Sequence, residues 1–250
     1  MNIRFLVTIL AMAGPLTAQE PAPKEPVPPP APPQPGSTTP PKPAKRSLLK
    51  YTPPKDTASG QRIDGDGGSR GEKKIKLPNY LCTLTPKSGP ALTVQEHPSL
   101  FSYVSDSVNM EFRVTINEPK QSKPAFIFAV SQCAQGVHRV NLAEYGVTLK
   151  PGVEYKWTVA VRPDQKNRSQ DLPATGLIKR IEPDSALMAK LKAAPQADHA
   201  AIYAEAGIWY DALAALADQI AANPQDAELL AMRADFLKAA GLDKVSVAKP

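Results

Sequence analysis

The stretch "VTLKPGVEYKWTVAV", residues 147–161, decides the fold class. From Tyr155 onward, large apolar residues alternate with polar or small ones, which is the period-two pattern of a strand that buries one face. Pro151 and Gly152 stand just before this run and are typical of a tight turn. Because the alternation places Trp157 on the buried face, we interpret it as a core residue rather than as a platform for a ligand.

The same stretch resembles the corner that leads into strand F of immunoglobulin-like and fibronectin type III domains. In those domains a tyrosine at the start of the strand bonds back to nearby backbone and fixes the corner. The residues at the matching positions here are Leu149, Gly152, Tyr155 and Trp157. The resemblance implies a sandwich fold and says nothing about function.

Other strand-length runs with a period of two lie on both sides of this stretch, separated by clusters of Pro, Gly, Asn and Asp. The runs are 80–86, 100–105, 110–116, 125–131, 138–143, 155–161 and 175–181. Short strands spaced in this way, with no helical stretch between them, predict an all-β sandwich of the immunoglobulin or fibronectin type. We place this domain at residues 57–182 and include a glycine-rich lead-in, "RIDGDGGSRG" (62–71). The lead-in fails the calcium-loop pattern, because Gly68 and Ile75 stand where ligands are needed.

After residue 182 the period changes to 3.6, which predicts a small helical cap over residues 183–243. Most of this region resembles a tetratricopeptide repeat. The residues that define the helix pair are Tyr203, Gly207, Trp209, Tyr210, Ala212 and Leu216, with Pro224 as the terminating proline. One repeat cannot bury its own apolar face, so we expect the pair to pack on the sandwich. Trp209 and Tyr210 are then packing residues, and the alternative is that they form a docking surface for a partner.

The N-terminus predicts export of the protein. "MNIRFLVTILAMAGPLTAQE" has a positive charge at Arg4, an apolar run over 5–13 and a small residue, Ala18, where a signal peptidase could cut. We therefore expect a signal peptide at residues 1–18 and a periplasmic or extracellular location. The apolar run is too short for a permanent membrane helix, and no other stretch approaches that length, so we expect no transmembrane span in the mature chain.

Residues 19–56 are predicted to be a disordered, proline-rich spacer. Half of the 28 prolines of the chain lie here, and the segment lacks the apolar residues that would offset the chain entropy lost on folding. Consecutive prolines favour polyproline II, which makes such a segment a semi-rigid spacer. Two readings stay open for it: a functional one, as a spacer across a cell-wall layer or a PxxP ligand, and a tail without a specific partner.

The chain has a net charge of +6, and one group of basic residues precedes the first predicted strand. These residues are Arg70, Lys73, Lys74 and Lys76. In an exported protein a basic patch suits anionic envelope polymers better than nucleic acid, and the aromatic interleaving of a nucleic-acid platform is missing. A solvated basic face is the alternative.

The two cysteines, Cys82 and Cys133, form a candidate disulfide, because their count is even and no metal-ligand cluster surrounds them. Such a bridge would close a loop of about 50 residues and stabilise the fold by roughly 4 kcal/mol. Two unpaired, buried thiols are the alternative.

Six short motifs fall between about residue 50 and residue 240. They are "YTPP" (51–54), "GDGGSRG" (65–71), "YLCTLTP" (80–86), "HPSLFSYV" (97–104), "LKPGVEYKW" (149–157) and "YAEAGIWYDALAAL" (203–216). Together they resemble a bacterial secreted family known as domain of unknown function 928. The resemblance implies an exported protein with this layout, and it transfers no functional residue.

The sequence predicts no catalytic, metal or cofactor site. None of the three histidines, His97, His138 and His199, has a metal-ligand neighbour at helical or strand spacing. No serine lies in a nucleophile-elbow setting. We therefore expect a non-catalytic protein-interaction module of the cell envelope, whose partner is another envelope protein. The alternative function is a binder of a glycan or of an anionic envelope polymer such as the cell wall carries.

Overall fold

The computed structural model describes residues 49–54, 61–67, 69–70, 75–87, 89–121 and 123–246. The chain divides into two units, Met1–Pro43 and Ala44–Pro250, and every described residue belongs to the second. The predicted signal peptide at residues 1–18 and the predicted spacer as far as residue 48 lie outside the described residues.

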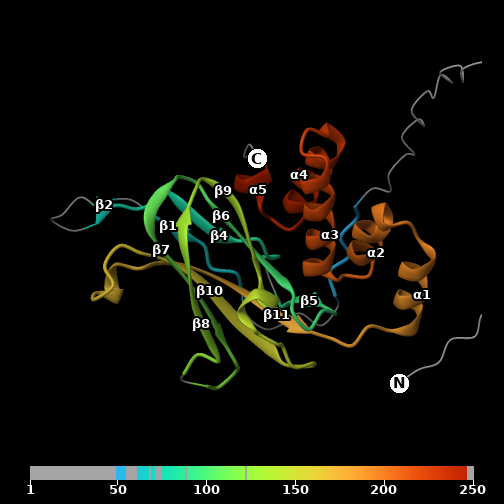
Figure 1. Cartoon of the computed structure of the whole chain (residues 1–250), viewed down its shortest axis with the longest axis horizontal. Helices are drawn as coiled ribbons and strands as arrows, with labels where there is room; N and C mark the ends of the chain where they lie inside the picture. The colour runs from blue at the N-terminus through green and yellow to red at the C-terminus, as the bar shows by residue number, and fades with distance from the viewer. Residues whose placement is uncertain are drawn as a thin grey trace, which may run out of the picture. The chain divides into compact units, whose positions relative to one another are not determined.

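Two sheets form the β part of the described unit (Figure 1). The four-stranded sheet has the order β1-β4-β6-β9, with bounds Gly65–Asp66 (β1), Tyr80–Thr83 (β4), Ser99–Val104 (β6) and Gly136–Asn141 (β9). The five-stranded sheet has the order β5-β11-β10-β7-β8, with bounds Ala91–Thr93 (β5), Leu172–Arg180 (β11), Glu154–Arg162 (β10), Val108–Asn117 (β7) and Phe126–Cys133 (β8). Strand β5 pairs parallel with β11, and the other pairs in both sheets are antiparallel. Ser69–Arg70 (β2) and Ile75–Lys76 (β3) form a separate two-stranded ribbon.

The helices follow the strands in the chain. Their bounds are Ser185–Ala193 (α1), His199–Glu205 (α2), Trp209–Ala222 (α3), Ala227–Ala239 (α4) and Asp243–Ser246 (α5), with short 3-10 turns at Leu142–Tyr145 (η1), Arg168–Gln170 (η2) and Gln196–Asp198 (η3). Asp184 begins α1 as its N-cap, because its carboxylate accepts the Leu187 N–H at 2.6 Å. Asp226 begins α4 in the same way. The architecture is therefore two mostly antiparallel sheets followed by a few helices, in the order the sequence predicts.

The alternating large residues of β10 form part of the core between the two sheets. Tyr155, Trp157, Val159 and Val161 are all buried, as their alternation predicts. They belong to one apolar cluster with residues of β4 and β6 in the other sheet. Strands β4 and β6 are buried along their whole length. Residues of α4 and α5 join the same cluster.

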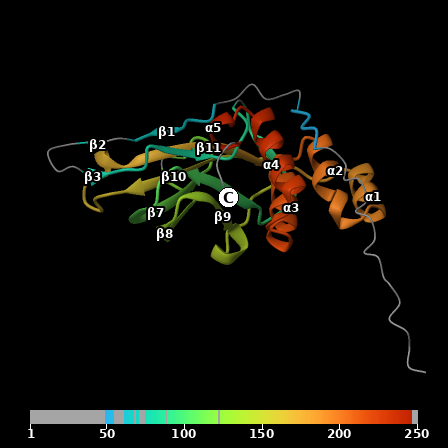
Figure 2. The same cartoon turned by 90° about the horizontal axis from the view of Figure 1, so that it is seen from above.

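Helices α1–α4 lie at one end of the sheets in both Figure 1 and Figure 2. Two aromatic residues at the start of α3 connect the helices to the β part of the chain through hydrogen bonds. The Trp157 indole N–H donates to the Tyr210 hydroxyl at 2.7 Å, and that hydroxyl donates to the Leu177 carbonyl at 3.2 Å. The Trp209 indole N–H donates to the Leu84 carbonyl at 2.7 Å. Both α3 rings are fully buried against the sheets, so helices and sheets share one core.

The structure places the start of the packed chain earlier than the sequence did. Residues 49–54, which the sequence assigned to the spacer, lie against the helices. The Tyr51 ring meets Trp209 edge-on with 5.0 Å between ring centroids, and the Thr52 N–H donates to the Ala204 carbonyl at 3.2 Å. The assignment was wrong here because Leu49 and Tyr51 supply apolar surface that proline-rich sequence lacks.

The structure also contains strands that the sequence did not predict. Strands β1 and β5 span two and three residues, too few to show an alternating pattern. The chain before β1 links the two sheets, because Ile63 bridges to Thr175 of β11 while Gly65 pairs with Leu81 of β4. At the predicted corner, the Lys150 N–H donates to the Tyr155 hydroxyl at 3.1 Å.

Candidate functional site

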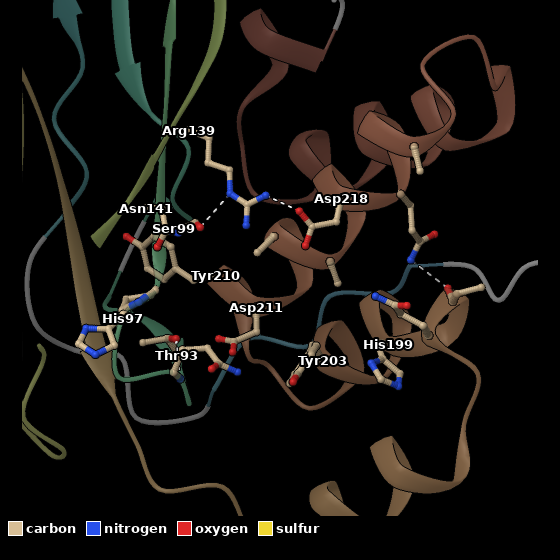
Figure 3. Close-up of a pocket in the computed structure, with 18 of the residues that line it drawn as sticks. Thr93, His97, Ser99, Arg139, Asn141, His199, Tyr203, Tyr210, Asp211 and Asp218 are labelled. Atoms are coloured by element: carbon tan, nitrogen blue, oxygen red, sulfur yellow. Dashed lines mark hydrogen bonds and ion pairs between the residues drawn. The ribbon is translucent and has the colours of Figure 1, made fainter. Parts of the chain in front are cut away.

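A pocket of about 540 Å³ lies between the ends of the sheets and the helices (Figure 3). One wall comes from the chain around β5, β6 and β9, and the other from η3, α2 and α3. The residues labelled in the figure are Thr93, His97, Ser99, Arg139, Asn141, His199, Tyr203, Tyr210, Asp211 and Asp218. The pocket is thus built from segments that lie more than a hundred residues apart in the chain.

The pocket is hollow because the face of α3 that borders it carries small residues. Ala214, Ala215 and Ala222 line it, and their spacing puts them on the same helix face as Asp211 and Asp218. Three bulky residues of α3, Trp209, Leu213 and Leu216, are buried and do not line the pocket, whereas Tyr210 does. One helix therefore fills the core with one face and leaves room for a ligand with another.

Asp211 is the most unusual residue in this lining. It stands in the first turn of α3 and is only 5% exposed. Its Oδ2 accepts the Val94 N–H at 3.3 Å, while its Oδ1 is buried without a hydrogen-bond partner among the residues that the structure describes. Burial raises the pKa of the Asp211 carboxyl from its ordinary 3.8 to about 6, and the polar groups of Thr93, Val94 and Gln95 beside it oppose that rise. An unsatisfied, buried carboxylate oxygen is costly and calls for an explanation.

A second carboxylate of the lining is already paired. The Arg139 guanidinium, on β9, forms an ion pair with Asp218 of α3, and its Nε donates to the Ser99 hydroxyl at 2.8 Å. Figure 3 shows this ion pair apart from the Asp211 carboxylate, which lies between Thr93 and Tyr203. The charges of Arg139 and Asp218 therefore cancel, and the charge of Asp211 stays uncompensated.

Alongside the alanines, the rest of the lining carries many uncharged polar side chains. Amide side chains come from Gln95, Asn141, Gln196, Gln219 and Asn223. The His97 ring donates through Nδ1 to the Val147 carbonyl at 2.7 Å, and the His199 ring donates through Nε2 to the Leu191 carbonyl at 3.0 Å. Such amide groups can pair with both the N–H and the C=O of a ligand.

A protein-family model described as "Domain of Unknown Function (DUF928)" matches residues 65–250. The chain belongs to the DUF928 family. The match includes every residue that lines the pocket and begins after the packed segment 49–54. No curated protein matches this DUF928 chain.

Two of the helix-pair residues that the sequence singled out line the pocket of this DUF928 protein, namely Tyr203 and Tyr210. The others lie elsewhere: Trp209, Ala212 and Leu216 are core residues. Gly207 has a φ of +75°, which only glycine adopts readily, and a Cβ there would lie 2.7 Å from the Thr52 carbonyl oxygen.

The predicted corner residues of the DUF928 chain do not line the pocket. Leu149, Tyr155 and Trp157 are buried in the core, and Gly152 occupies a turn with a φ of +77°. In the basic group, Lys73 and Lys74 lie outside the described residues, as do the side chains of Arg70 and Lys76.

The candidate disulfide of the DUF928 chain is not formed in the structure, because Cys82 is a free, buried thiol. The side chain of Cys133 lies outside the described part. Burial raises the pKa of the Cys82 thiol to about 12, which keeps it protonated at neutral pH. Of the two alternatives for Cys82, the structure contains the buried thiol.

Sequence reasoning missed Asp211, Arg139 and Asp218. A weak signal did exist for Asp211, since it is the single charged residue within the apolar run "GIWYDALAALA" (207–217). No comparable signal marks Arg139, which meets α3 only in the folded chain.

None of the described helices of the DUF928 protein combines the length and the apolar composition that a membrane crossing requires. Over the same described residues, no group of three or more His, Cys, Asp and Glu side chains is placed to hold a metal ion.

Proposed function

We propose that this DUF928 protein is a non-catalytic binding protein of the cell envelope, and that its pocket receives a segment of another envelope protein. The observation that carries the proposal is the pocket itself, which is polar and holds a buried carboxylate oxygen without a partner. The N-terminus supports export, since Arg4 followed by an apolar run over residues 5–13 is the pattern of a signal peptide.

The arrangement of the lining favours binding over catalysis. A general acid or base must reach the proton that it transfers. Arg139 is already paired with Asp218, and Asp211 Oδ2 accepts the Val94 N–H. His97 and His199 each use one ring nitrogen to donate to a backbone carbonyl.

The amide-rich wall supports a peptide as the occupant. An extended peptide carries alternating N–H and C=O groups, which side-chain amides can satisfy without adding charge. The alternative, a glycan or an anionic envelope polymer, rests on the basic residues between 70 and 76. An anionic polymer would also meet an unpaired carboxylate in the pocket, which opposes its binding there.

Two finer features of the fold belong to this proposal. The strand order of the two sheets, together with the hydrogen bond from the Lys150 N–H to Tyr155, supports an immunoglobulin-like sandwich. The pairing of α2 with α3 through Gly207 supports a tetratricopeptide-like turn. We propose both as the scaffold that holds the pocket.

The test is capture of a partner from a native envelope extract with the protein from residue 19 onward as bait. Ala222→Trp places an indole at an exposed position of the lining, and Ala231→Trp places the same ring on the exposed face of α4 outside it. We expect the wild type and Ala231→Trp to capture the same protein and Ala222→Trp to lose it. Equal capture by both variants would contradict a role for the pocket. Salt-sensitive retention of all three on isolated cell wall would favour the polymer binder instead.

A further inference from the structure

We propose that the pocket recognises a protonated primary amine, carried by a lysine side chain of the bound peptide, and that Asp211 is the residue that binds it. This inference rests on the proposed function and names the chemistry of the ligand at the same site. It follows from four features of the pocket.

The first feature is the hydrogen bonding of the Asp211 carboxylate. Only one of its oxygens has a partner, since Oδ2 accepts the Val94 N–H and Oδ1 accepts nothing among the described residues. A carboxylate that is 5% exposed cannot rely on bulk water to satisfy the second oxygen. A donor supplied by a ligand removes this cost and gives the site its affinity.

The second feature is the balance of charge in the pocket. Its described charged side chains are Asp211, Asp218 and Arg139. Arg139 is paired with Asp218, so the sum is one negative charge, which lies on Asp211. Like charges repel strongly at short range in a buried site, so this pocket disfavours a carboxylate or phosphate and favours a cation.

The third feature concerns which cation fits. A guanidinium binds a carboxylate best as a fork that uses both oxygens, and here the Val94 N–H already occupies Oδ2. A metal ion needs several oxygen ligands, but the nearby Thr93 hydroxyl is engaged by the Gln95 N–H at 3.1 Å. An ammonium group is a compact charge with three N–H donors, so one of them can bind Oδ1 while side-chain amide oxygens of the lining accept the others.

The fourth feature is an aromatic ring beside the carboxylate. Tyr203 of α2 lines the pocket next to Asp211 (Figure 3). Burial, and then the negative charge of Asp211, raise the pKa of the Tyr203 hydroxyl. A ring and a carboxylate together suit an ammonium group and the methylene chain that carries it. Farther along the pocket lie the amides of Gln219 and Asn223. Gln219 Nε2 donates to the Ala197 carbonyl at 3.1 Å, so its oxygen and the Asn223 amide are the groups that can bind the peptide backbone.

The experiment is calorimetric titration of the whole exported chain with short peptides at pH 7.5. The main probe is acetyl-Gly-Lys-Gly-amide, in which the lysine carries the only amine. The comparison peptides are the same peptide with acetyl-lysine, the same peptide with arginine, and Gly-Gly-Gly-amide with a free N-terminus. We expect the lysine peptide to bind and acetylation of its side chain to weaken binding by about tenfold or more. Equal binding of the acetylated peptide would overturn the proposal without requiring any protein variant. Tighter binding of the free N-terminus would assign the amine to a chain end.

The matched protein variants are Asp211→Asn and Asp235→Asn, because Asp235 is exposed on α4 outside the pocket. We expect Asp211→Asn to weaken binding of the lysine peptide by about tenfold or more while Asp235→Asn binds as the wild type does. Thermal unfolding of both variants shows whether each is folded. Unchanged binding by a folded Asp211→Asn protein would overturn the proposal. If no amine binds but Ala222→Trp still abolishes capture from the envelope extract, the amine assignment is wrong and the binding function stands. If no amine binds and Ala222→Trp also leaves capture unchanged, both proposals are rejected.

Discussion

At the scale of single residues, Asp211 is kept in an unfavourable state. Its carboxylate is buried in the pocket wall with one oxygen unsatisfied, while the buried Trp157 and Trp209 indoles both have hydrogen-bond partners. A residue that served only packing would be replaced by an amide or an apolar group at no loss to the fold. The cost in stability is consistent with a role in binding, since functional sites commonly retain such costs.

Replacing Asp211 with Asn should therefore stabilise the protein at neutral pH. The folded pKa is about 6 and the unfolded one about 3.8, so the folded state binds more protons between these values and stability falls as pH rises from about 4 to about 6. Above pH 7 the cost of burying the ionised Asp211 carboxylate is fully present. Removing it raises the free energy of unfolding by at most about 3 kcal/mol. At pH 4 the gain should be largely absent. Urea denaturation at pH 4 and pH 7.5 measures both values.

The groups beside the Asp211 carboxyl are the Thr93 side chain, the Val94 N–H, the Gln95 side chain and the Tyr203 ring. Asp235→Asn, which removes an exposed carboxylate of α4 outside the pocket, serves as the control. A loss of stability in Asp211→Asn at both pH values would mean that the bond to Val94 is structural.

At the scale of elements, the turn between α2 and α3 depends on one glycine. Gly207 and Gly152 have nearly the same φ, +75° and +77°, but only Gly207 has atoms close to the position of a Cβ, the nearest being the Thr52 carbonyl oxygen at 2.7 Å. Gly152→Ala should cost only the left-handed strain, about 1 kcal/mol. Gly207→Ala should cost more, about 2–4 kcal/mol, because the clash adds to the strain. Equal decreases in the free energy of unfolding for Gly207→Ala and Gly152→Ala, measured with denaturant, would mean that the segment 49–54 moves away from the new Cβ at no cost in stability.

The segment 49–54 is a packed element although it has no regular secondary structure. Tyr51 lies edge-on to Trp209 and to Phe236, with ring centroids 5.0 and 6.0 Å away, and burial raises the pKa of its hydroxyl to about 12. Tyr51→Ala should lower the free energy of unfolding by about 2–3 kcal/mol, because it removes these ring contacts and leaves a cavity.

Tyr145→Ala is the matched control for Tyr51→Ala, since Tyr145 is 40% exposed. Tyr145→Ala should lower the free energy of unfolding by only about 1 kcal/mol, mainly because the stacking of Tyr145 on Phe128 is removed. The midpoint of guanidinium unfolding distinguishes the two. A Tyr51→Ala protein as stable as the wild type would show that this segment contributes no stability to the helices.

At the scale of the whole molecule, the sheets and helices form one cooperative unit. Trp209, Tyr210 and Phe236 belong to the same buried cluster as the strands, and Trp157 of β10 has its indole bond to Tyr210 of α3. No boundary in packing coincides with the change of sequence period after residue 182. The pocket exists only where the two parts meet.

A chain that ends at residue 182 should therefore not fold as a stable sandwich. It lacks the acceptor for the Trp157 N–H and exposes the core surface that α3 and α4 cover, and large apolar exposure of this kind leads to aggregation. The full chain should unfold in one transition by circular dichroism and tryptophan fluorescence, whereas the shortened chain should bind a hydrophobic dye and lose its cooperative transition. A shortened chain with a sharp transition would show two separable domains.

The sequence by itself determined the order of strands before helices and the buried face of β10, because the period of apolar residues is a local property. It also determined the family, through motifs spread along the chain. Only the tertiary structure decided that residues 49–54 pack on the helices, that Cys82 is a free thiol and that Asp211 lies in a pocket opposite Arg139. The physical reason is that burial and charge pairing depend on contacts between distant segments, and a sequence pattern records which face is apolar but not what that face meets.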